Sequence, residues 1–234
     1  MKITCRNVEK LYALDGRTIR ALAGVSCEMR SGELVVVMGR SGSGKTTLLN
    51  AIGGLDRPTG GDVLVDDKDL YASGDRALSR YRNERIGFVF QSFHLSHDET
   101  ALENVLVPFL FARRPPRDAA DRGRSALARV GLGDQVAQPA GTLSAGQKQR
   151  VAIARAIVNE PEFVLADEPT GNLDERTGAD IVALLSGLAR QGLGVVIVTH
   201  DPAVSQVADR VLRIADGLIV DGAEVGTADG ATGR

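Results

Sequence analysis

The chain has no tryptophan, only two cysteines, few aromatic residues and no surplus of charge of either sign. Cys5 and Cys27 are too few for a disulfide framework and fit a reducing compartment. The 28 basic residues are balanced by 30 acidic residues, which leaves a net charge of −2. This balance argues against a protein that binds nucleic acid through bulk positive charge, so we expect no nucleic-acid partner.

Long hydrophobic runs are also missing. The longest, residues 105–112, is eight residues long and contains a proline, whereas a membrane helix needs about 20 apolar residues. The first residues form no apolar segment of the kind found in secretory signals. We therefore expect a chain that does not span a bilayer by itself.

The pattern that is present indicates an α/β fold with a mostly parallel sheet, because strand-like and helix-like stretches alternate. Buried strands are expected at residues 34–38, 162–166 and 194–199, with a helix over 44–52. Residues 3–14 and 18–29 carry short β-prone stretches on either side of a turn at Asp15 and Gly16. They predict an antiparallel β subdomain at the N-terminus.

Between about residues 93 and 159 the pattern changes to helices. The predicted helices span residues 101–111, 117–130 and 146–158, and prolines separate them. We interpret this stretch as a helical subdomain inserted into the α/β core of a single domain of residues 1–221. Residues 222–234 are rich in Gly, Ala and Thr and are expected to form a disordered tail.

A phosphate-binding loop follows the first buried strand. The loop consists of Gly39, Arg40, Ser41, Gly42, Ser43, Gly44, Lys45, Thr46 and Thr47, which match G-x-x-x-x-G-K-[ST]. Glycines let successive backbone N–H groups point at a phosphate chain, and the helix N-terminus adds partial positive charge. Lys45 is expected to contact the β- and γ-phosphates, and the Thr46 hydroxyl to ligate Mg²⁺. A glycine-rich turn with a stray lysine is the alternative, and chance produces such a match in about one chain per hundred of this length.

Polar residues at three further strand ends complete the expected site. Asp167 is predicted to lie near Mg²⁺ and Glu168 to act as the general base that activates water. His200 is expected to contact the γ-phosphate, and the carbonyl oxygen of Gln91 to reach the metal or the attacking water. Each residue would be weak evidence alone, since two acids at a strand end are often solvated and a lone histidine is often structural.

Residues Leu143, Ser144, Ala145, Gly146 and Gln147 resemble the LSGGQ signature of ATP-binding-cassette (ABC) ATPases. A hydroxyl and backbone N–H groups at a helix N-terminus form an anion site there. Residues 166–174 look like the Walker B and D-loop segments of the same family, in which Asp174 would touch a partner subunit. Tyr12 sits where the family has an aromatic residue that stacks on adenine. The resemblance covers residues 3–220. Within it, the segments 52–60 and 100–105 are similar to those of the subgroup that contains lipoprotein-release, macrolide-export and cell-division ATPases.

The resemblance implies an ATP- and Mg²⁺-dependent ATPase that dimerises around two ATP molecules and drives a separate integral membrane permease. It also implies a peripheral location on the cytoplasmic face of the cell membrane. One departure is Ala145, where the signature of the family has a glycine, and this puts the rate of hydrolysis in doubt more than ATP binding. A basic run that includes Arg117, Arg122 and Arg124 is interpreted as a solvated helix face in preference to a lipid contact.

Two other classes of function agree less well with the sequence. A soluble ABC ATPase that acts on DNA or ribosomes would carry long coiled coils or a second cassette, and this chain has neither. A P-loop kinase or GTPase would leave the signature unexplained, and no Asn-Lys-x-Asp segment is present.

The segment from Gln91 to Ala112 predicts the docking site for the permease. Leu102, Val105, Leu106 and Phe109 follow helical spacing and should face the core. Phe93, Leu95, and Phe111 or Leu110 would then be left for an exposed groove that receives a short helix of the membrane subunit. The alternative is that all eight side chains belong to the core.

Overall fold

The computed structural model describes residues 1–14, 16–112 and 115–224. Residues 15, 113–114 and 225–234 lie outside the described part, and with them most of the expected tail. Its first three residues are not a tail, because the last strand continues to Glu224. Residues 222–224 pair antiparallel with Leu212, Val211 and Arg210 of the preceding strand.

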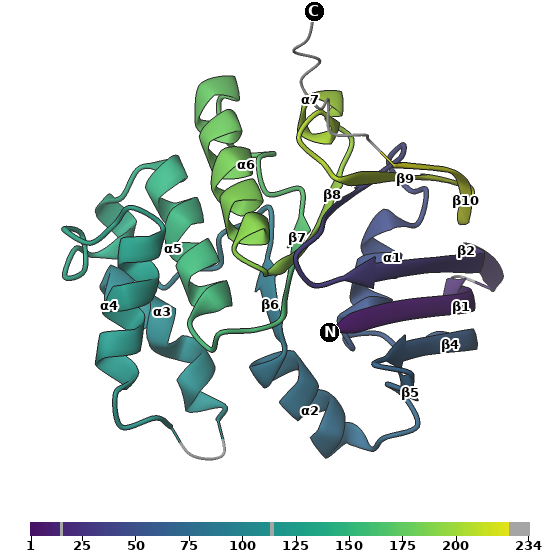
Figure 1. Ribbon diagram of the computed structural model, residues 1–234, viewed down its shortest axis with the longest axis horizontal. Helices are drawn as coiled ribbons and strands as arrows, with labels where there is room; N and C mark the ends of the chain where they lie inside the picture. The colour runs from purple at the N-terminus through teal and green to yellow at the C-terminus, as the bar shows by residue number, and fades with distance from the viewer. Residues whose placement is uncertain (15, 113–114, 225–234) are drawn as a thin grey trace, which may run out of the picture.

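A six-stranded sheet forms the centre of the molecule, in the order β10-β9-β3-β8-β7-β6 (Figure 1). Its strands are β3 (Leu34–Met38), β6 (Ile86–Val89), β7 (Phe163–Asp167), β8 (Gly194–Thr199), β9 (Arg210–Ala215) and β10 (Leu218–Glu224). Neighbouring strands from β9 to β6 are parallel, and β10 pairs antiparallel with β9. This confirms the predicted α/β fold, and the carboxyl ends of β3, β6, β7 and β8 meet at one edge.

A second, antiparallel sheet has the order β2-β1-β4-β5. It consists of β1 (Lys2–Leu14), β2 (Arg17–Arg30), β4 (Gly60–Val65) and β5 (Lys68–Asp69). The first two strands are longer than the short stretches expected from the sequence, because register shifts keep them paired over their whole length. Figure 1 shows this sheet at the end of the molecule opposite the helices α3, α4 and α5.

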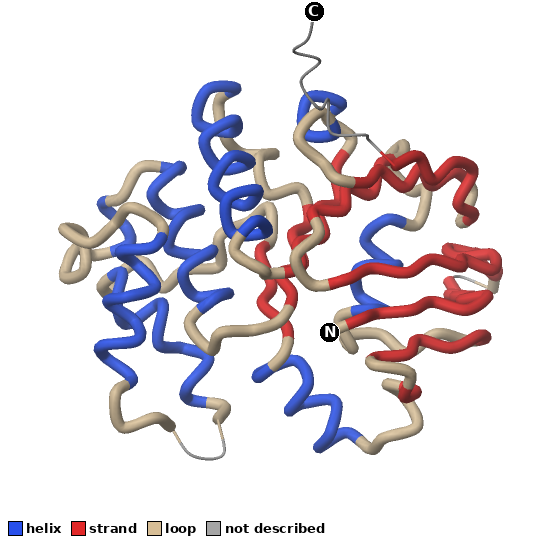
Figure 2. Tube along the Cα trace, in the orientation of Figure 1, coloured by secondary structure: helices blue, strands red, loops and turns tan. Residues whose placement is uncertain are grey.

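The helices are α1 (Lys45–Ile52), α2 (Asp75–Glu84), α3 (Ala101–Leu110), α4 (Ala119–Arg129), α5 (Ala145–Ile157), α6 (Glu175–Arg190) and α7 (Pro202–Ser205). A short 3₁₀ turn, Ala140–Thr142, precedes α5. Helices α3, α4 and α5 pack on one another, as Figure 2 shows in blue. The sequence did not predict α2, α6, α7, β4, β5, β9 or β10.

Two apolar cores cover the two faces of the central sheet. In β3, Leu34 and Val36 belong to the core shared with α3–α6, whereas Val35 and Val37 belong to the core shared with α1 and the antiparallel sheet. Since side chains alternate across a strand, a continuous apolar run is required where both faces are covered. This explains why β3 reads Leu-Val-Val-Val-Met in the sequence.

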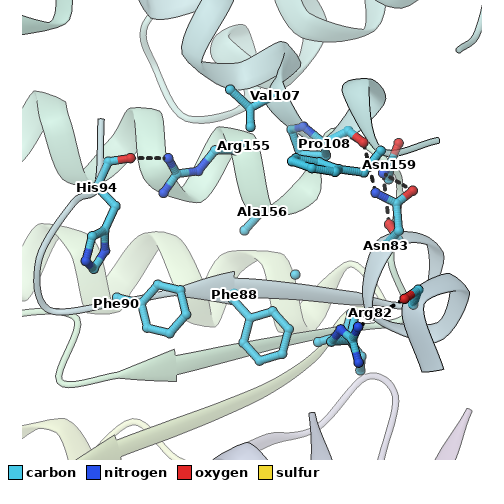
Figure 3. Close-up of a pocket in the computed structure, with 14 residues that line it drawn as sticks. Arg82, Asn83, Phe88, Phe90, His94, Val107, Pro108, Arg155, Ala156 and Asn159 are labelled. Atoms are coloured by element: carbon cyan, nitrogen blue, oxygen red, sulfur yellow. Dashed lines mark hydrogen bonds between the residues drawn. The ribbon is translucent and has the colours of Figure 1, made fainter. Parts of the chain in front are cut away.

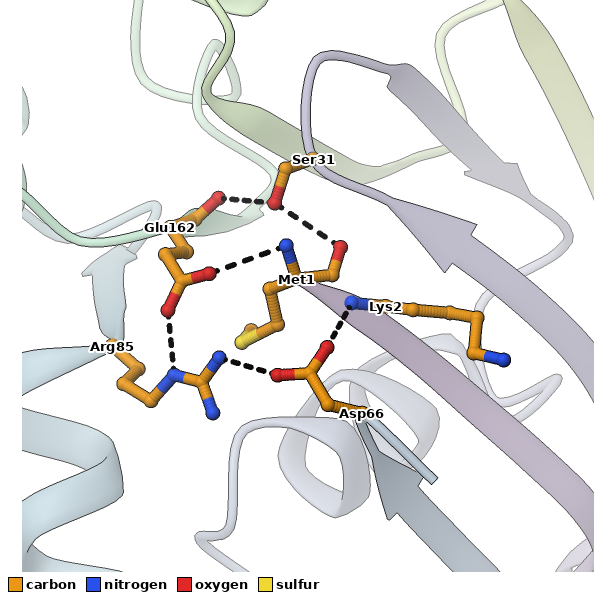
Figure 4. A network of polar contacts seen from close by, with 6 residues as sticks. All are labelled: Met1, Lys2, Ser31, Asp66, Arg85 and Glu162. Carbon is orange, nitrogen blue, oxygen red and sulfur yellow. Dashed lines mark hydrogen bonds and ion pairs between the residues drawn. The ribbon is translucent and has the colours of Figure 1, made fainter. Parts of the chain in front are cut away.

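A polar network joins the antiparallel sheet to the central sheet at the amino ends of β6 and β7 (Figure 4). The Arg85 guanidinium donates to Asp66 Oδ2 at 2.7 Å and to Glu162 Oε1 at 2.6 Å. Asp66 also accepts from the backbone N–H of Lys2, and Glu162 pairs with the α-ammonium group of Met1. Arg85 therefore connects the turn after β4 with the residue that precedes β7.

Candidate functional site

The phosphate-binding loop leaves β3 at Met38 and enters α1 at Lys45. Gly44 has a φ of +105°, and a Cβ atom there would lie 2.3 Å from the carbonyl oxygen of Ala21. A Cβ at Gly39 would lie 2.3 Å from the carbonyl oxygen of Ile214. Because no side chain fits at either position, glycine is required for the loop to pack between β2 and β9.

Lys45 is buried, and its ammonium group donates to the carbonyl oxygens of Gly39 at 2.8 Å and Arg40 at 2.9 Å. Gly44 provides no side-chain cap for α1. The first N–H groups of α1 therefore remain available for an anion, together with the positive end of the helix dipole.

Asp167 ends β7 directly opposite the loop. The Thr46 hydroxyl donates to Asp167 Oδ1 at 3.2 Å, as the sequence predicted for two groups that share a site. Burial raises the pKa of the Asp167 carboxyl, and the charge of Glu168 adds to the rise, while Thr46 and Lys45 oppose it. A cation bound between these groups would relieve this repulsion.

Glu168 follows Asp167 with a φ of +46°, which is uncommon outside glycine. Its carboxylate accepts a hydrogen bond from the Thr199 hydroxyl at 3.1 Å and lies 2.8 Å from His200 Nδ1. The imidazole itself is 73% exposed. The structure thus pairs two residues that were predicted separately, and Thr199, which the sequence analysis missed, orients one of them.

The loop and these strand ends surround a cleft of about 680 Å³. It is lined by Ala21, Arg40, Ser41, Gly42, Gly44, Lys45, Thr46, Thr47, Gln91, Asp167, Glu168 and His200. Of these residues only Ala21 was not predicted. It belongs to no motif, and it reaches the cleft because β2 passes over the loop.

Tyr12 lies on β1, outside this set of lining residues. Its hydroxyl donates to Asp56 Oδ2 at 2.6 Å, and the Lys10 ammonium lies 5.0 Å from the ring centre. Burial and the bond to Asp56 raise the pKa of the phenol. Stacking of the ring on adenine stays a prediction.

Ser144 caps α5. Its hydroxyl accepts from the backbone N–H of Gln147 at 3.2 Å, and Gln147 Oε1 accepts from the N–H of Ser144 at 2.9 Å. Ala145 is exposed, whereas Gly146 is buried, and a Cβ there would lie 2.5 Å from Thr177 Cγ2. These four residues do not line the cleft of their own chain.

Asp174 caps α6 in the same region. Its carboxylate accepts from the Thr177 N–H at 3.0 Å and from the Thr177 hydroxyl at 2.6 Å, and these bonds lower its pKa. The sequence analysis assigned Asp174 to a partner contact and missed this capping role. An aspartate before a helical run is an N-cap signal that could have revealed it.

A separate groove of about 640 Å³ lies between α3, α5 and β6 (Figure 3). Phe88, Phe90, Val107, Pro108 and Phe111 supply its apolar lining, and Arg82 and Arg155 its charge. Phe111 is 77% exposed. The expectation of an exposed groove with Phe111 is confirmed, and so is the inward face of α3, where Val105 and Phe109 are buried.

The expectation that Phe93 and Leu95 line the groove is wrong, and of the two alternatives Phe111 and Leu110 only Phe111 lines it. Leu95 packs against the core, and Phe93 is half-buried. The loop turns back over α5, where Arg155 donates to the carbonyl oxygens of Phe93 and His94. Leu110 is 79% exposed but does not line the groove.

Within residues 1–14, 16–112 and 115–224, no helix has the length and apolarity of a membrane span. The same residues contain no group of three or more His, Cys, Asp or Glu side chains that could hold a metal ion.

Known proteins share both the sequence and the fold. A family model described as "ABC transporter" matches residues 22–171. The chain therefore belongs to the ABC transporter family, as an ATP-binding subunit that hydrolyses ATP. The curated relatives are transport proteins, which supports this function over the alternative on DNA or ribosomes.

The relatives include the lipoprotein-releasing system ATP-binding protein LolD of Chromohalobacter salexigens, which is 44% identical over 94% of each chain. An uncharacterized ABC transporter ATP-binding protein of Bacillus subtilis, YvrO, is 47% identical over 93% of this chain and 95% of its own length. Macrolide export protein MacB 1/2 of Paracoccus denitrificans is 45% identical over 93% of this chain but only 33% of its own length.

Among solved structures, the dimeric ABC transporter cassette MJ0796 has a TM-score of 0.86 and 40% identity, and covers 96% of this chain and 99% of its own. A post-hydrolysis state of the same cassette, bound to ADP and Pi, matches equally well.

Proposed function

We propose that the cleft binds and hydrolyses ATP with the residues that the sequence singled out. Residues 39–47 cradle the phosphates, with Lys45 on the β- and γ-phosphates. Glu168 is the general base, and His200 and Gln91 contact the γ-phosphate and the attacking water. The observation that carries this proposal is that Lys45, Thr46, Asp167, Glu168 and His200 converge on one cleft from separate elements.

The oxygen ligands fit Mg²⁺. Thr46 Oγ1 and Asp167 Oδ1 lie 3.2 Å apart, and Gln91, whose side chain carries an amide oxygen, lines the same cleft. Mg²⁺ takes one or two protein oxygens and completes its shell with phosphate and water. We propose that these three residues hold the metal, which neutralises charge on the phosphates when bound.

Completion of the site requires a second copy of the chain. Ser144, Ala145, Gly146 and Gln147 present a helix N-terminus outside their own cleft. In a head-to-tail homodimer this anion site would face the γ-phosphate bound by the other copy. The solved dimers of the similar cassette support this arrangement. Asp174 would lie at the same interface, and Tyr12 would stack on adenine.

Replacement of the general base tests the proposal. Glu168→Gln keeps the size of the side chain and should lower ATP hydrolysis by roughly 10²–10⁴-fold, the worth of a positioned base. It should retain ATP binding and shift from monomer to dimer on a sizing column with ATP and Mg²⁺. Glu84→Gln, an exposed position on α2 away from the cleft, is the control and should hydrolyse ATP at the parental rate. Parental hydrolysis by Glu168→Gln would remove Glu168 from this role.

We further propose that the groove between α3, α5 and β6 receives a helix of an integral membrane permease, so that the chain works peripherally on the cytoplasmic face of the membrane. Residues 93–159 would act as a helical subdomain within one domain and carry part of this groove. The apolar lining and the charges of Arg82 and Arg155 favour a helix that combines apolar side chains with an acidic group.

Two neighbouring exposed residues separate docking from other effects. Phe111→Asp should abolish co-purification with the permease, because Phe111 lines the groove. Leu110→Asp changes an equally exposed residue outside the groove and should leave co-purification intact. Both variants should keep the ATPase activity of the isolated subunit. Undiminished co-purification of Phe111→Asp contradicts the docking assignment.

A further inference from the structure

Gln149 is a fully buried amide in the second turn of α5. Its Nε2 group donates to the carbonyl oxygen of Pro169 at 2.7 Å and lies 3.5 Å from that of Phe90. Two carbonyl oxygens accept only from the NH₂ side of an amide, so the orientation of Gln149 is fixed. The other side, Oε1, is buried and has no hydrogen-bond partner among the described residues.

The first of these carbonyl groups belongs to Pro169, the residue that follows Glu168. The left-handed backbone of Glu168 is unfavourable and persists only where the surroundings hold it. Its N–H donates to Val198 at 2.9 Å, and its carbonyl oxygen accepts from Gly171 at 3.1 Å. The bond from Gln149 fixes the next peptide group and so completes a set of restraints on the direction of the Glu168 side chain.

The second carbonyl group belongs to Phe90, the residue that precedes Gln91. The Gln91 carbonyl oxygen itself accepts from Asn172 Nδ2 at 2.8 Å. The backbone of Gln91 therefore lies between the side chain of Gln149 on one side and the segment that follows Glu168 on the other. One buried amide thus contacts the peptides next to both residues that the proposed mechanism places at the attacking water.

Stability alone does not explain the choice of glutamine at this position. The amide satisfies the carbonyl oxygen of Pro169, but its own Oε1 is buried without a partner among the described residues, which is unfavourable. We propose that Gln149 is a positioning residue for hydrolysis, which holds Pro169 and Phe90 so that Glu168 and Gln91 keep their places in the cleft. This inference rests on the roles assigned to Glu168 and Gln91 above.

Gln149→Met tests the inference, because methionine has nearly the same length and no polar atom to bond the two carbonyl groups. We expect kcat for ATP hydrolysis to fall by roughly 10- to 100-fold, the usual effect of a small misplacement of catalytic groups. The KM for ATP should stay unchanged, because Gln149 does not line the cleft. The thermal midpoint should fall, because the buried carbonyl oxygen of Pro169 loses its donor, so kcat is compared with that of a control variant that loses stability in the same way. Gln149→Leu is the second variant and should behave alike, so that failure of either to fold leaves the other to decide.

Asn104 offers a matched control. It is also a buried amide, and its Nδ2 group donates to the carbonyl oxygens of Ser96 and Thr100, away from Phe90 and Pro169. Asn104→Leu should lower the thermal midpoint and leave the kcat of the folded protein unchanged. A parental kcat for both Gln149 variants overturns the inference, as does an equal loss of kcat in Asn104→Leu.

Glu168→Gln, measured in parallel, separates this inference from the proposed function. Inactive Glu168→Gln with fully active Gln149 variants overturns the role of Gln149 alone. Active Glu168→Gln overturns the proposed function and, with it, the role of Gln149.

Discussion

The close contact between Gly146 and Thr177 yields a prediction about how the signature segment is built. The Cβ atom of Gly146→Ala would lie 2.5 Å from Thr177 Cγ2. Thr177 cannot simply rotate away, because its hydroxyl donates to Asp174 at 2.6 Å and its N–H is capped by the same carboxylate. The methyl group therefore strains the contact or breaks the cap of α6.

The magnitude follows from the geometry. Carbon atoms in favourable contact lie about 3.5–4.0 Å apart, so the overlap is roughly 1 Å. Overpacking of this kind costs about 1–3 kcal/mol, and the better helix propensity of alanine returns at most about 1 kcal/mol. With the full gain from helix propensity the net loss is about 0–2 kcal/mol, which corresponds to a drop of up to roughly 8 °C in the thermal midpoint of a chain of this size.

A double-mutant cycle measured by calorimetry tests this reasoning. Thr177→Ser removes the methyl group in the contact and keeps the hydroxyl for Asp174, so the pair Gly146→Ala/Thr177→Ser should recover most of the loss. The expected coupling is about 0.5–3 kcal/mol, the range for residues in contact. If the loss of stability in the double variant equals the sum of the losses in Gly146→Ala and Thr177→Ser, the two residues are not coupled. That result would refute the reasoning.

Three further predictions concern single residues. Ala145→Gly should leave steady-state ATP hydrolysis unchanged or raise it modestly, because the methyl group is exposed; a collapse of activity would show that the alanine is required. Asp167→Asn should raise the thermal midpoint of the nucleotide-free protein at pH 7, because burial raises the pKa of Asp167 and its charge therefore opposes folding. This gain should vanish as the pH falls below about 4, where the carboxyl is neutral in both folded and unfolded protein, and a gain that is the same at every pH contradicts it. Arg85→Met should weaken the acid-induced loss of stability. The hydrogen bonds of Arg85 lower the pKa of Asp66 and of Glu162. The two ionised carboxylates therefore stabilise the folded protein above their usual pKa values, and this stabilisation is lost as the pH falls. An unchanged slope of stability against pH below about 5 would contradict this role.

The part of the site that the sequence predicted is the part built from local geometry. Lys45 and Thr46 are placed by a loop whose glycines fix its shape, and Asp167 and His200 by the ends of apolar strands. Parallel strands bring their carboxyl ends to one edge, so residues that are 121 positions apart, such as Thr46 and Asp167, could be placed together without any structure.

The residues that the sequence did not predict owe their place to packing between elements. Ala21 lines the cleft because β2 crosses the loop, and Thr199 reaches Glu168 because β7 and β8 are neighbours. The same limit explains the error at the groove. Helical periodicity placed Val105 and Phe109 correctly. Phe93 and Leu95 lie in a loop whose path depends on hydrogen bonds from Arg155, and the sequence of a loop has no regular spacing from which burial could be predicted.

The signature segment shows how a departure from a family pattern acquires a physical meaning only in three dimensions. The sequence showed that one of two glycines is replaced by Ala145, without indicating which of the two positions tolerates a side chain. In the structure the replaced position faces solvent at the start of α5, whereas Gly146 lies against Thr177. An exposed first position of a helix accepts alanine readily, and its N–H stays available to an anion. The substitution therefore falls at the position of the pair that is exposed within its own chain, and in the proposed dimer its effect on turnover would depend on how closely the phosphate bound by a second copy approaches it.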